Sequence, residues 1–544
     1  MKVLVIGGVA AGTKAAAKLK RCNEDIEVKI ITKGKDISYA GCGLPYYIGG
    51  SIKNKEDLIV NTPQSFTELT QVEVVCEAEA VAVDTVHKIV KVAKDDEIYD
   101  EDYDKLIIAS GAYPFVPKME GTDLSGVFTV RTPEDAIAMR SYIEEHAVKK
   151  AVVCGAGFIG LEVAENLHAR NIAVTIIDAA EQIMPNAFDE EMAAFAQRQL
   201  QVAGIKVLTS CAINKIIGDK WVQGVVSAKG NLDADLVVLA IGIRPATQFL
   251  TGSDIAMDRG AIVVNEYMET NVADVYAVGD CALVKNALTN KPQWAAMGSI
   301  ANLTGRVVAQ NCVGHKVKYL GCMGSGVAKL LANLHCGRTG LTEAQAKAEG
   351  YDVVSVVWVG DDKAHYYEDA STFVTKLIAD RTSQRLLGLQ VIGGHAVDKM
   401  VDIAVMGISA KFKLHDFDTL DFAYAPPFST AIHPLVNACY VLENKIEGRL
   451  DSVTPWEFAR GSCKDHHIID VQPRPYIAGA RWVDLAAVDK EMEGLNKDAK
   501  LLLVCTKGKR AYFLYNRLKA LGYQNVKILE GGTFVNEMQL LADQ

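Results

Sequence analysis

Two cysteines lie where the neighbouring residues could make their sulfur atoms reactive. The first, Cys42, stands between Gly41 and Gly43, directly before a segment from Leu44 that can start a helix. A helix N-terminus carries positive partial charge, which favours a thiolate over a thiol. This pattern predicts a reactive sulfur beside a cofactor. The alternative is a buried cysteine in a glycine-rich turn.

The second, Cys505, follows an apolar stretch over residues 500–504 that predicts a buried strand, and it precedes a predicted helix over residues 511–521. A loop that joins a strand to a helix gathers backbone N–H groups around one atom. Three cations add positive charge to this loop: Lys507, Lys509 and Arg510. The pattern favours a stable thiolate or persulfide anion at Cys505.

A complete dinucleotide-binding motif is the clearest element that could position a cofactor. A predicted strand over residues 151–154 leads into the turn 155–160 (Gly-Ala-Gly-Phe-Ile-Gly), and the next predicted strand, 173–177, ends at Asp178. Backbone N–H groups at such a turn hold a pyrophosphate. A carboxylate at the position of Asp178 accepts ribose hydroxyls and repels a 2′-phosphate. The motif predicts NADH in preference to NADPH, and the alternative is a turn without a ligand.

A less complete copy of this motif opens the chain, at residues 7–12 (Gly-Gly-Val-Ala-Ala-Gly). Val9 stands at the middle glycine position, and Thr32 and Lys33 stand where an acidic residue would hold a ribose. Two dinucleotide folds in one chain suggest two dinucleotides. Predicted strands also end at residues 109–111 (Ala-Ser-Gly) and at Gly279-Asp280, where a carboxylate can accept a hydrogen bond from a polyol.

Together these motifs resemble those of the two-dinucleotide flavoprotein disulfide reductases. The resemblance implies FAD at the first turn, NADH at the second, Asp280 at the ribityl chain and Phe158 as an aromatic gate over the flavin. The residues implied for FAD are Gly7, Ala10, Ala11, Gly12, Thr32, Lys33, Ala109, Ser110, Gly111, Arg131, Gly279 and Asp280. Those implied for NADH are Gly155, Gly157, Phe158, Ile159, Gly160, Asp178 and Gly242.

The residues after Cys42 indicate one branch of that family. Two-cysteine members carry a second cysteine five positions on, where this chain has Tyr47. The chain therefore resembles the single-cysteine branch of FAD-dependent pyridine nucleotide-disulfide reductases, which contains coenzyme A-disulfide reductases, NADH-dependent persulfide reductases, and NADH oxidases and peroxidases. The continuation Gly-Leu-Pro-Tyr-Tyr resembles the CoA-linked members most, although Gly41 replaces their usual asparagine.

The same resemblance implies a CoA site. Lys18 and Arg21 could meet the CoA phosphates, and Ser38 matches a serine of the family pattern. The alternative for Lys18 and Arg21 is an ordinary solvated helix face.

Tyrosines farther along the chain resemble those that complete the site in a homodimer. Tyr424 matches a residue that reaches the other subunit, Tyr367 a second catalytic residue, and Tyr366 a contact to CoA. A tyrosine hydroxyl beside a thiolate can donate a hydrogen bond to sulfur or act as an acid. The alternative is that these are core or interface aromatics. His433 could also be an acid, although a histidine before a proline is more often structural.

Residues 455–540 resemble a rhodanese domain. The loop from Cys505 to Arg510 has six residues, as in sulfur-transferring members, whereas phosphatase relatives have one more, so Cys505 and Arg510 are expected to be catalytic. Gln472 stands where these domains usually have arginine. The alternative is a degenerate docking domain with an inert Cys505.

The fold expected is α/β, with two Rossmann-like domains, an α+β dimerisation domain and a C-terminal rhodanese-like α/β domain. The boundaries expected are residues 1–112 with 245–320 for FAD, 113–244 for NADH, 321–446 for dimerisation and 455–544 for the rhodanese-like domain.

Composition limits the other classes of partner. The net charge of −10 disfavours nucleic acid, and no apolar run is long enough to cross a bilayer. The chain opens directly with a predicted strand, so no signal peptide is expected. Twelve scattered cysteines without zinc-type spacing favour reduced thiols in the cytoplasm and no metal site.

We therefore expect a homodimeric FAD enzyme that uses NADH to reduce sulfane sulfur through Cys42, with sulfur transferred at Cys505. The alternatives are an NADH oxidase or peroxidase that works through a Cys42 sulfenic acid, and a sulfur carrier or redox sensor. The sequence leaves open whether the substrate is CoA disulfide, CoA persulfide, glutathione persulfide or polysulfide, and which way sulfur moves through Cys505.

Overall fold

The structure is a computed structural model that describes residues 1–542. Internal contacts divide the chain into two units. The first joins Met1–Glu181 to Gly204–Cys322, and the second joins Gln182–Ala203 to the chain from Met323 onward. The segment Gln182–Ala203 thus lies with the C-terminal half of the chain, although its neighbours in sequence belong to the first unit.

The first glycine turn follows the central strand of a parallel sheet with the order β20-β7-β1-β2-β3. In β1, Val3 and Val5 pack with helices α1 and α7, whereas Leu4 and Ile6 pack on the opposite face. Because both faces are covered, the strand is apolar throughout. The bounds are β1 (Lys2–Ile6), α1 (Ala10–Cys22), β2 (Glu27–Ile31), β3 (Glu73–Val75), β7 (Lys105–Ile108), β20 (Val275–Ala277) and α7 (Gly298–Cys312).

The second glycine turn follows the central strand of another parallel sheet, with the order β12-β11-β10-β16-β9. Helix α5 crosses from β10 to β11, so both predicted βαβ units are confirmed. The chain passes between the two parallel sheets through β8 and β17, which pair with each other. The bounds are β8 (Ala112–Pro114), β9 (Val127–Phe128), β10 (Lys150–Cys154), α5 (Phe158–Ala169), β11 (Ala173–Ile177), β12 (Lys206–Leu208), β16 (Leu236–Leu239) and β17 (Ile243–Pro245).

Smaller elements complete the first unit. The antiparallel strands are β4 (Glu79–Asp84), β5 (Ile89–Lys94), β6 (Glu97–Asp102), β13 (Ile213–Gly218), β14 (Val222–Ser227) and β15 (Gly230–Asp233). A mixed sheet contains β18 (Met257–Asp258), β19 (Ala261–Val263), β21 (Ala282–Lys285) and β22 (Pro292–Trp294). The helices are α2 (Leu44–Gly49), α3 (Pro63–Thr70) and α4 (Pro133–Glu145).

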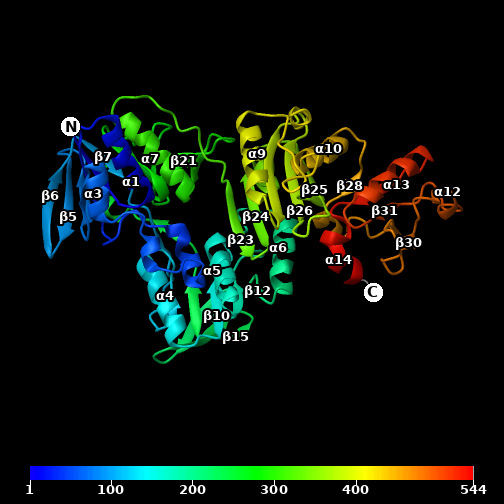
Figure 1. Ribbon diagram of the computed structural model, residues 1–544, viewed down its shortest axis with the longest axis horizontal. Helices are drawn as coiled ribbons and strands as arrows, with labels where there is room; N and C mark the ends of the chain where they lie inside the picture. The colour runs from blue at the N-terminus through cyan, green and yellow to red at the C-terminus, as the bar shows by residue number, and fades with distance from the viewer. Residues whose placement is uncertain (543–544) are drawn as a thin grey trace. The chain divides into compact units, whose positions relative to one another are not determined.

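An antiparallel sheet with the order β23-β24-β27-β26-β25 is the centre of the first part of the second unit. Helices α9 and α10 pack against it, as Figure 1 shows in yellow. The bounds are α6 (Glu190–Val202), β23 (Gly326–Leu331), β24 (Leu334–Gly340), α8 (Glu343–Ala348), β25 (Val353–Asp361), β26 (Thr372–Asp380), β27 (Leu386–Gly393), α9 (Val397–Ser409) and α10 (Pro434–Ile446).

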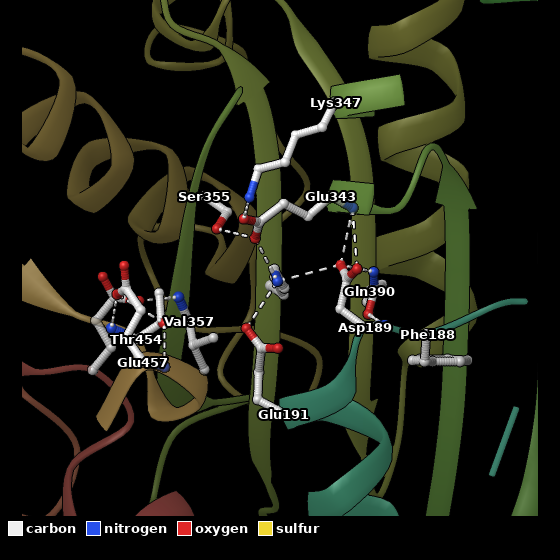
Figure 2. A network of polar contacts seen from close by, with 12 residues as sticks. Phe188, Asp189, Glu191, Glu343, Lys347, Ser355, Val357, Gln390, Thr454 and Glu457 are labelled. Carbon is white, nitrogen blue, oxygen red and sulfur yellow. Dashed lines mark hydrogen bonds and ion pairs between the residues drawn. The ribbon is translucent and has the colours of Figure 1, made fainter. Parts of the chain in front are cut away.

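A buried lysine joins the segment of α6 to this sheet. Lys376 Nζ on β26 lies 2.8 Å from Glu191, 2.8 Å from Glu343 and 3.3 Å from Asp189. Figure 2 shows these carboxylates converging on one amine, with Gln390 beside Asp189. Although burial alone would lower the pKa of Lys376, the three carboxylates raise it. The lysine is therefore charged, and it ties α6 to the sheet.

The C-terminal part is a parallel sheet with the order β28-β32-β31-β29-β30, drawn in orange and red in Figure 1. This part contains the three strands and the helix predicted there, together with the further strands β28 and β30 and the further helices α11, α12 and α14. The bounds are β28 (Ser452–Val453), α11 (Pro455–Ala459), β29 (His467–Asp470), β30 (Arg481–Trp482), α12 (Val488–Glu491), β31 (Leu501–Val504), α13 (Lys509–Ala520), β32 (Val526–Leu529) and α14 (Gly532–Ala542).

Residues 1–542 lack both a membrane-spanning helix and a cluster of metal-binding side chains. None of their helices has the length and apolar character needed to cross a membrane. Within the same residues, no three His, Cys, Asp or Glu side chains are grouped so that they could hold a metal ion.

Candidate functional site

The two glycine turns have the same backbone geometry. Gly7 and Gly155 each have φ +109°, and a Cβ added there would lie 2.1 or 2.2 Å from a carbonyl oxygen of the adjacent strand segment. A Cβ at Gly12 or Gly160 would lie 1.8 or 2.0 Å from the carbonyl oxygen of the first glycine of its turn. Only glycine fits these four positions, so both helices pack closely against their turns.

Open space and unpaired donors at these turns fit a pyrophosphate. A Cβ added to Gly157 would have no atom within 4 Å outside its immediate neighbours. Gly157 precedes α5 and Val9 precedes α1, and neither residue caps its helix with a side chain. The first N–H groups of both helices therefore remain available for phosphate oxygens. The residues present fit two dinucleotides, with Val9 occupying the middle position of the first turn.

Asp178 lies at the edge of the second turn, directly after β11. Its Oδ2 accepts a hydrogen bond of 2.6 Å from the N–H of Ala156, inside the turn, and its Oδ1 accepts one of 2.8 Å from Ala180. The carboxylate is therefore held beside the space next to Gly157. Phe158 and Ile159 begin α5 at the same point, and Gly242 follows β16 with φ +121°.

Residues predicted for the first dinucleotide also come together. Arg131 Nη2 donates to Asp280 Oδ2 at 2.9 Å, and a Cβ on Gly111 would lie 3.5 Å from the same guanidinium nitrogen. Thr32 is buried beside the first turn, whereas Lys33 is exposed and pairs with Glu79 at 2.9 Å. Arg131 and Asp280 therefore neutralise each other beside the strand end that contains Gly111.

Cys42 lies in a short 3₁₀ turn, Gly41–Gly43, directly before α2, and its side chain is exposed in this unit. The N-terminus of α7 is adjacent, because a Cβ added to Gly298 would lie 3.7 Å from Cys42 Sγ. The position next to two helix N-termini agrees with the prediction from the sequence. Two carboxylates, Glu162 and Asp280, also act on the sulfur.

The pKa of the Cys42 thiol is raised rather than lowered. Desolvation by neighbouring atoms is the largest cause, and the charges of Glu162 and Asp280 raise the pKa further. Only Arg131 opposes them among the causes. The charge of Glu162 therefore opposes ionisation of the Cys42 thiol, whereas the two helix N-termini favour it.

Glu162 is a site residue that the sequence analysis missed. It lies on α5, two residues beyond Gly160, and its Oε1 accepts a hydrogen bond of 3.2 Å from the Tyr46 hydroxyl on α2. Burial raises the pKa of Glu162 to about 7, with a further increase from Glu165 and a decrease from the Tyr46 hydrogen bond. The sequence signal for Glu162 is an acidic residue on the apolar first turns of α5, two positions after Gly160. Glu162 changes protonation near neutral pH, close to Cys42.

A cavity of about 710 Å³ opens beside α1. Arg21 and Ser38 line it, but Lys18 does not, and Lys14 and Lys20 also line it. Contact of these residues with CoA stays a prediction. Asn61 Nδ2 donates to Ser38 Oγ at 3.2 Å across the same cavity. Sequence reasoning missed Lys14 because one helix face cannot be chosen before its neighbours are known.

The predicted tyrosines lie in the second unit. Tyr366 and Tyr367 stand on the loop between β25 and β26 with ring centroids 5.3 Å apart, and Tyr366 and Tyr424 are exposed. Their approach to Cys42 stays a prediction. His433 caps α10: its Nδ1 accepts from the N–H of Leu435 at 3.2 Å. Burial lowers the pKa of His433 to about 4, so it is neutral and has a structural contact.

Cys505 lies at the end of β31 and is 2% exposed. The Gly508 N–H donates to its sulfur at 3.1 Å, and the Thr533 N–H donates to its carbonyl oxygen at 2.9 Å. Gly532 faces the same carbonyl, because a Cβ added there would lie 1.9 Å from that oxygen. One N–H group of this loop, that of Gly508, thus donates to the sulfur, and the larger gathering of N–H groups stays a prediction.

Two of the three cations of the Cys505 loop, Lys507 and Arg510, have partners elsewhere. Lys507 Nζ lies 2.5 Å from Asp361 Oδ1 on β25, and Arg510 Nε donates to the Val471 carbonyl at 2.7 Å. The charge of Lys507 is thus neutralised by a carboxylate rather than left to the sulfur. Gln472, also near this loop, accepts a hydrogen bond of 2.8 Å from the Thr506 hydroxyl through Oε1.

Three family models match the chain. The model described as pyridine nucleotide-disulphide oxidoreductase matches residues 1–300, its dimerisation domain matches residues 329–436, and the rhodanese-like domain matches residues 454–535.

Named relatives cover most of the chain. It is 35% identical to an NADH oxidase of Methanocaldococcus jannaschii over 80% of this chain and 97% of the relative. It is 34% identical to an NAD(P)H coenzyme A polysulfide/persulfide reductase of Pyrococcus horikoshii, over 81% of this chain and 98% of the relative.

Two solved structures match nearly the whole chain with TM-scores of 0.93. An NAD-dependent persulfide reductase from A. fulgidus is 34% identical, with 98% of this chain and 100% of that chain covered. The reduced CoADR-RHD of Bacillus anthracis is 31% identical, with 100% of this chain and 98% of that chain covered.

Proposed function

The chain belongs to the pyridine nucleotide-disulphide oxidoreductase family, and from that premise we propose that it is an NADH-dependent reductase of CoA-linked sulfane sulfur. Cys42 is the proposed redox centre, and Cys505 is the proposed sulfur-transfer residue. The proposal is carried by the presence, on one chain, of two dinucleotide turns and two cysteines in distinct polar surroundings. Cys505 is buried and accepts a hydrogen bond from Gly508, and the charge of Glu162 acts on the ionisation of Cys42.

The residues of the first unit suit two dinucleotides. FAD, when bound, supplies two-electron transfer between NADH and a sulfur atom. The N–H groups that begin α1 would hold its pyrophosphate and Asp280 would face its ribityl chain, while Asp178 would accept the ribose hydroxyls of NADH. Asp178 already accepts a backbone hydrogen bond at the second turn, which orients its carboxylate.

The chemistry at Cys42 follows from a single cysteine that needs a second sulfur from a small thiol. With CoA persulfide, the Cys42 thiolate attacks the sulfur bonded to the CoA carbon chain, so a Cys42–CoA disulfide forms and HS⁻ leaves. Two electrons from NADH then cleave this disulfide, which restores the Cys42 thiolate and releases CoA after it takes up one proton. Glu162, whose pKa is about 7, can hold a proton beside this centre at neutral pH.

The cavity beside α1 suits the nucleotide end of CoA. Lys14 and Arg21 line it and carry the charge that phosphate groups need. Ser38 and Asn61, which are hydrogen-bonded to each other, add polar groups to the lining of the cavity. We propose these residues as the CoA site of the first unit. A contact of Tyr366 with CoA is a separate proposal from the family resemblance.

A Cys42→Ser variant tests the function. We expect the purified wild-type protein to release sulfide from CoA persulfide with NADH, and Cys42→Ser to lose at least 100-fold in rate (~3 kcal/mol) because no thiolate can form the mixed disulfide. Cys76→Ser, which replaces another thiol of the first unit, is the control. A wild-type rate of sulfide release in Cys42→Ser would overturn the mechanism.

A second candidate is an NADH oxidase or peroxidase, and a relative at 35% identity is named an NADH oxidase. A single cysteine can also cycle through a sulfenic acid. NADH consumption measured with oxygen, peroxide, CoA disulfide and polysulfide in parallel separates the two activities. Faster turnover with oxygen or peroxide than with either sulfur substrate would favour the oxidase or peroxidase.

A further inference from the structure

Polar pairs hold together the two ends of the loop that carries Tyr366 and Tyr367. Residues 362–371 join β25 to β26, and across this loop Asp362 accepts hydrogen bonds from the Ser371 N–H at 2.8 Å and from its hydroxyl at 3.1 Å. Lys363 Nζ lies 2.6 Å from Asp369. These contacts hold the two sides of the loop together and leave the tyrosines at its tip.

The base of the loop is held by a residue from another domain. Asp361 ends β25 and Thr372 begins β26, and the two are cross-strand partners. Lys507 Nζ donates to both: to Asp361 Oδ1 at 2.5 Å and to Thr372 Oγ1 at 3.2 Å. One ammonium group from the Cys505 loop therefore bridges the two strand ends from which the tyrosine loop emerges.

Lys507 is also part of the structure around the sulfur. It lies between Thr506, which donates to Gln472, and Gly508, whose N–H donates to Cys505 Sγ. The lysine is about one-third exposed, and so is Asp361. Because its charge is paired with Asp361, Lys507 contributes less to the stability of a Cys505 anion than an unpaired cation would.

We propose that Lys507, a residue of the rhodanese-like domain, is a positioning residue for the reductase site. Its contacts with Asp361 and Thr372 fix the position of the loop that carries Tyr366 and Tyr367. The proposal rests on the proposed function, because it takes these tyrosines as groups that meet the CoA substrate. A rhodanese-like domain would then have two roles, sulfur transfer at Cys505 and support of the reductase loop at Lys507. The second role does not require Cys505 to react.

The test uses the full-length protein in a Cys505→Ala background, where sulfur transfer at Cys505 is absent. The assay is NADH-dependent reduction of CoA disulfide. We expect Lys507→Met to lower kcat/KM about 10-fold, because a displaced loop misplaces the tyrosines. Lys507→Arg should restore most of the loss, since it can still donate to Asp361 and Thr372. Lys509→Met removes the same charge from an exposed residue at the start of α13, two positions on, and should have no effect.

A second measurement does not depend on activity. We expect Lys507→Met and Asp361→Asn to accelerate hydrogen exchange in peptides that cover residues 362–371, with unchanged exchange in β27. Unchanged kcat/KM and unchanged exchange in Lys507→Met would overturn the proposal. If the wild-type protein reduces neither CoA disulfide nor CoA persulfide, the proposed function fails, while the exchange measurement still decides whether Lys507 holds the loop.

Discussion

Glu162 is the acid whose charge state acts on the Cys42 thiol and itself changes near neutral pH. Its carboxyl has a pKa of about 7, and its charge is one of the causes that raise the pKa of Cys42. Above pH 7 the carboxylate opposes ionisation of the thiol, and below pH 7 this effect disappears because Glu162 is protonated. The reactive form of Cys42 is thus linked to a proton on a neighbouring helix.

We expect Glu162→Gln to lower the pKa of Cys42, because the glutamine has no charge but can still accept a hydrogen bond from Tyr46. The rate at which iodoacetamide alkylates Cys42, measured as a function of pH, gives this pKa. Glu145→Gln, at the exposed end of α4, is the control and should leave the profile unchanged. An identical profile in Glu162→Gln and wild type would show that Glu162 does not control the thiol.

At the scale of elements, the network of Lys376 explains why α6 lies with the C-terminal sheet (Figure 2). Asp189 and Glu191 enter from the segment of α6, and Glu343 begins α8. Three carboxylates around one buried amine are stable only while the amine is charged. Burial alone would raise the pKa of Glu343, but Lys376 and Lys347 lower it to about 2.

We expect Lys376→Met to lower the free energy of unfolding of the second unit by about 3–5 kcal/mol, because the three carboxylates lose their buried cation. Urea denaturation followed by circular dichroism measures the change. Lys347→Met removes a lysine that lies 2.6 Å from Glu343 but is largely exposed, and it should cost no more than about 0.5 kcal/mol. Equal losses in the two variants would contradict a central role for Lys376.

The same network has a pH signature. The unfolded chain takes up a proton on Glu343 near pH 4.5, and the folded chain does so near pH 2. The stability from this carboxylate is therefore present above pH 4.5 and is lost as the pH falls from 4.5 toward 2. In Lys376→Met we expect this part of the acid dependence to shrink, which a comparison of denaturation at pH 3.5 and pH 6 would measure.

At the scale of the whole molecule, the second unit exposes a group of large apolar side chains near its predicted catalytic tyrosine. Tyr424, Phe428 and Ile432 are 52%, 71% and 50% exposed in the single chain. The family model for the dimerisation domain covers this segment. These side chains are suited to burial against a second copy of the chain, which agrees with the predicted homodimer.

We expect Phe428→Asp to shift the protein from dimer toward monomer, because a buried interface carboxylate would lack a partner. Size-exclusion chromatography with light scattering measures the mass. Val86→Asp, which places the same charge at an exposed apolar residue of the first unit, is the control. A dimer that persists in Phe428→Asp at micromolar concentration would place the interface elsewhere.

The sequence by itself determined the features that depend on short-range patterns. The spacing of Gly155, Gly157 and Gly160, the acid at Asp178 and the apolar strands around them identify a βαβ unit, because turn and helix geometry are set by neighbouring residues. The six-residue loop after Cys505 and the missing second cysteine at Tyr47 likewise indicated a family branch and a rhodanese-like domain.

Only the tertiary structure decided the electrostatic environment and the long-range partners. Burial raises the pKa of the Cys42 thiol, and Glu162 and Asp280, which come from distant parts of the chain, raise it further. Lys507 meets Asp361 across 146 residues, so a predicted sulfur-stabilising cation is a partner of the tyrosine loop instead. Charge and burial act through space, and the sequence pattern does not specify which residues folding brings together.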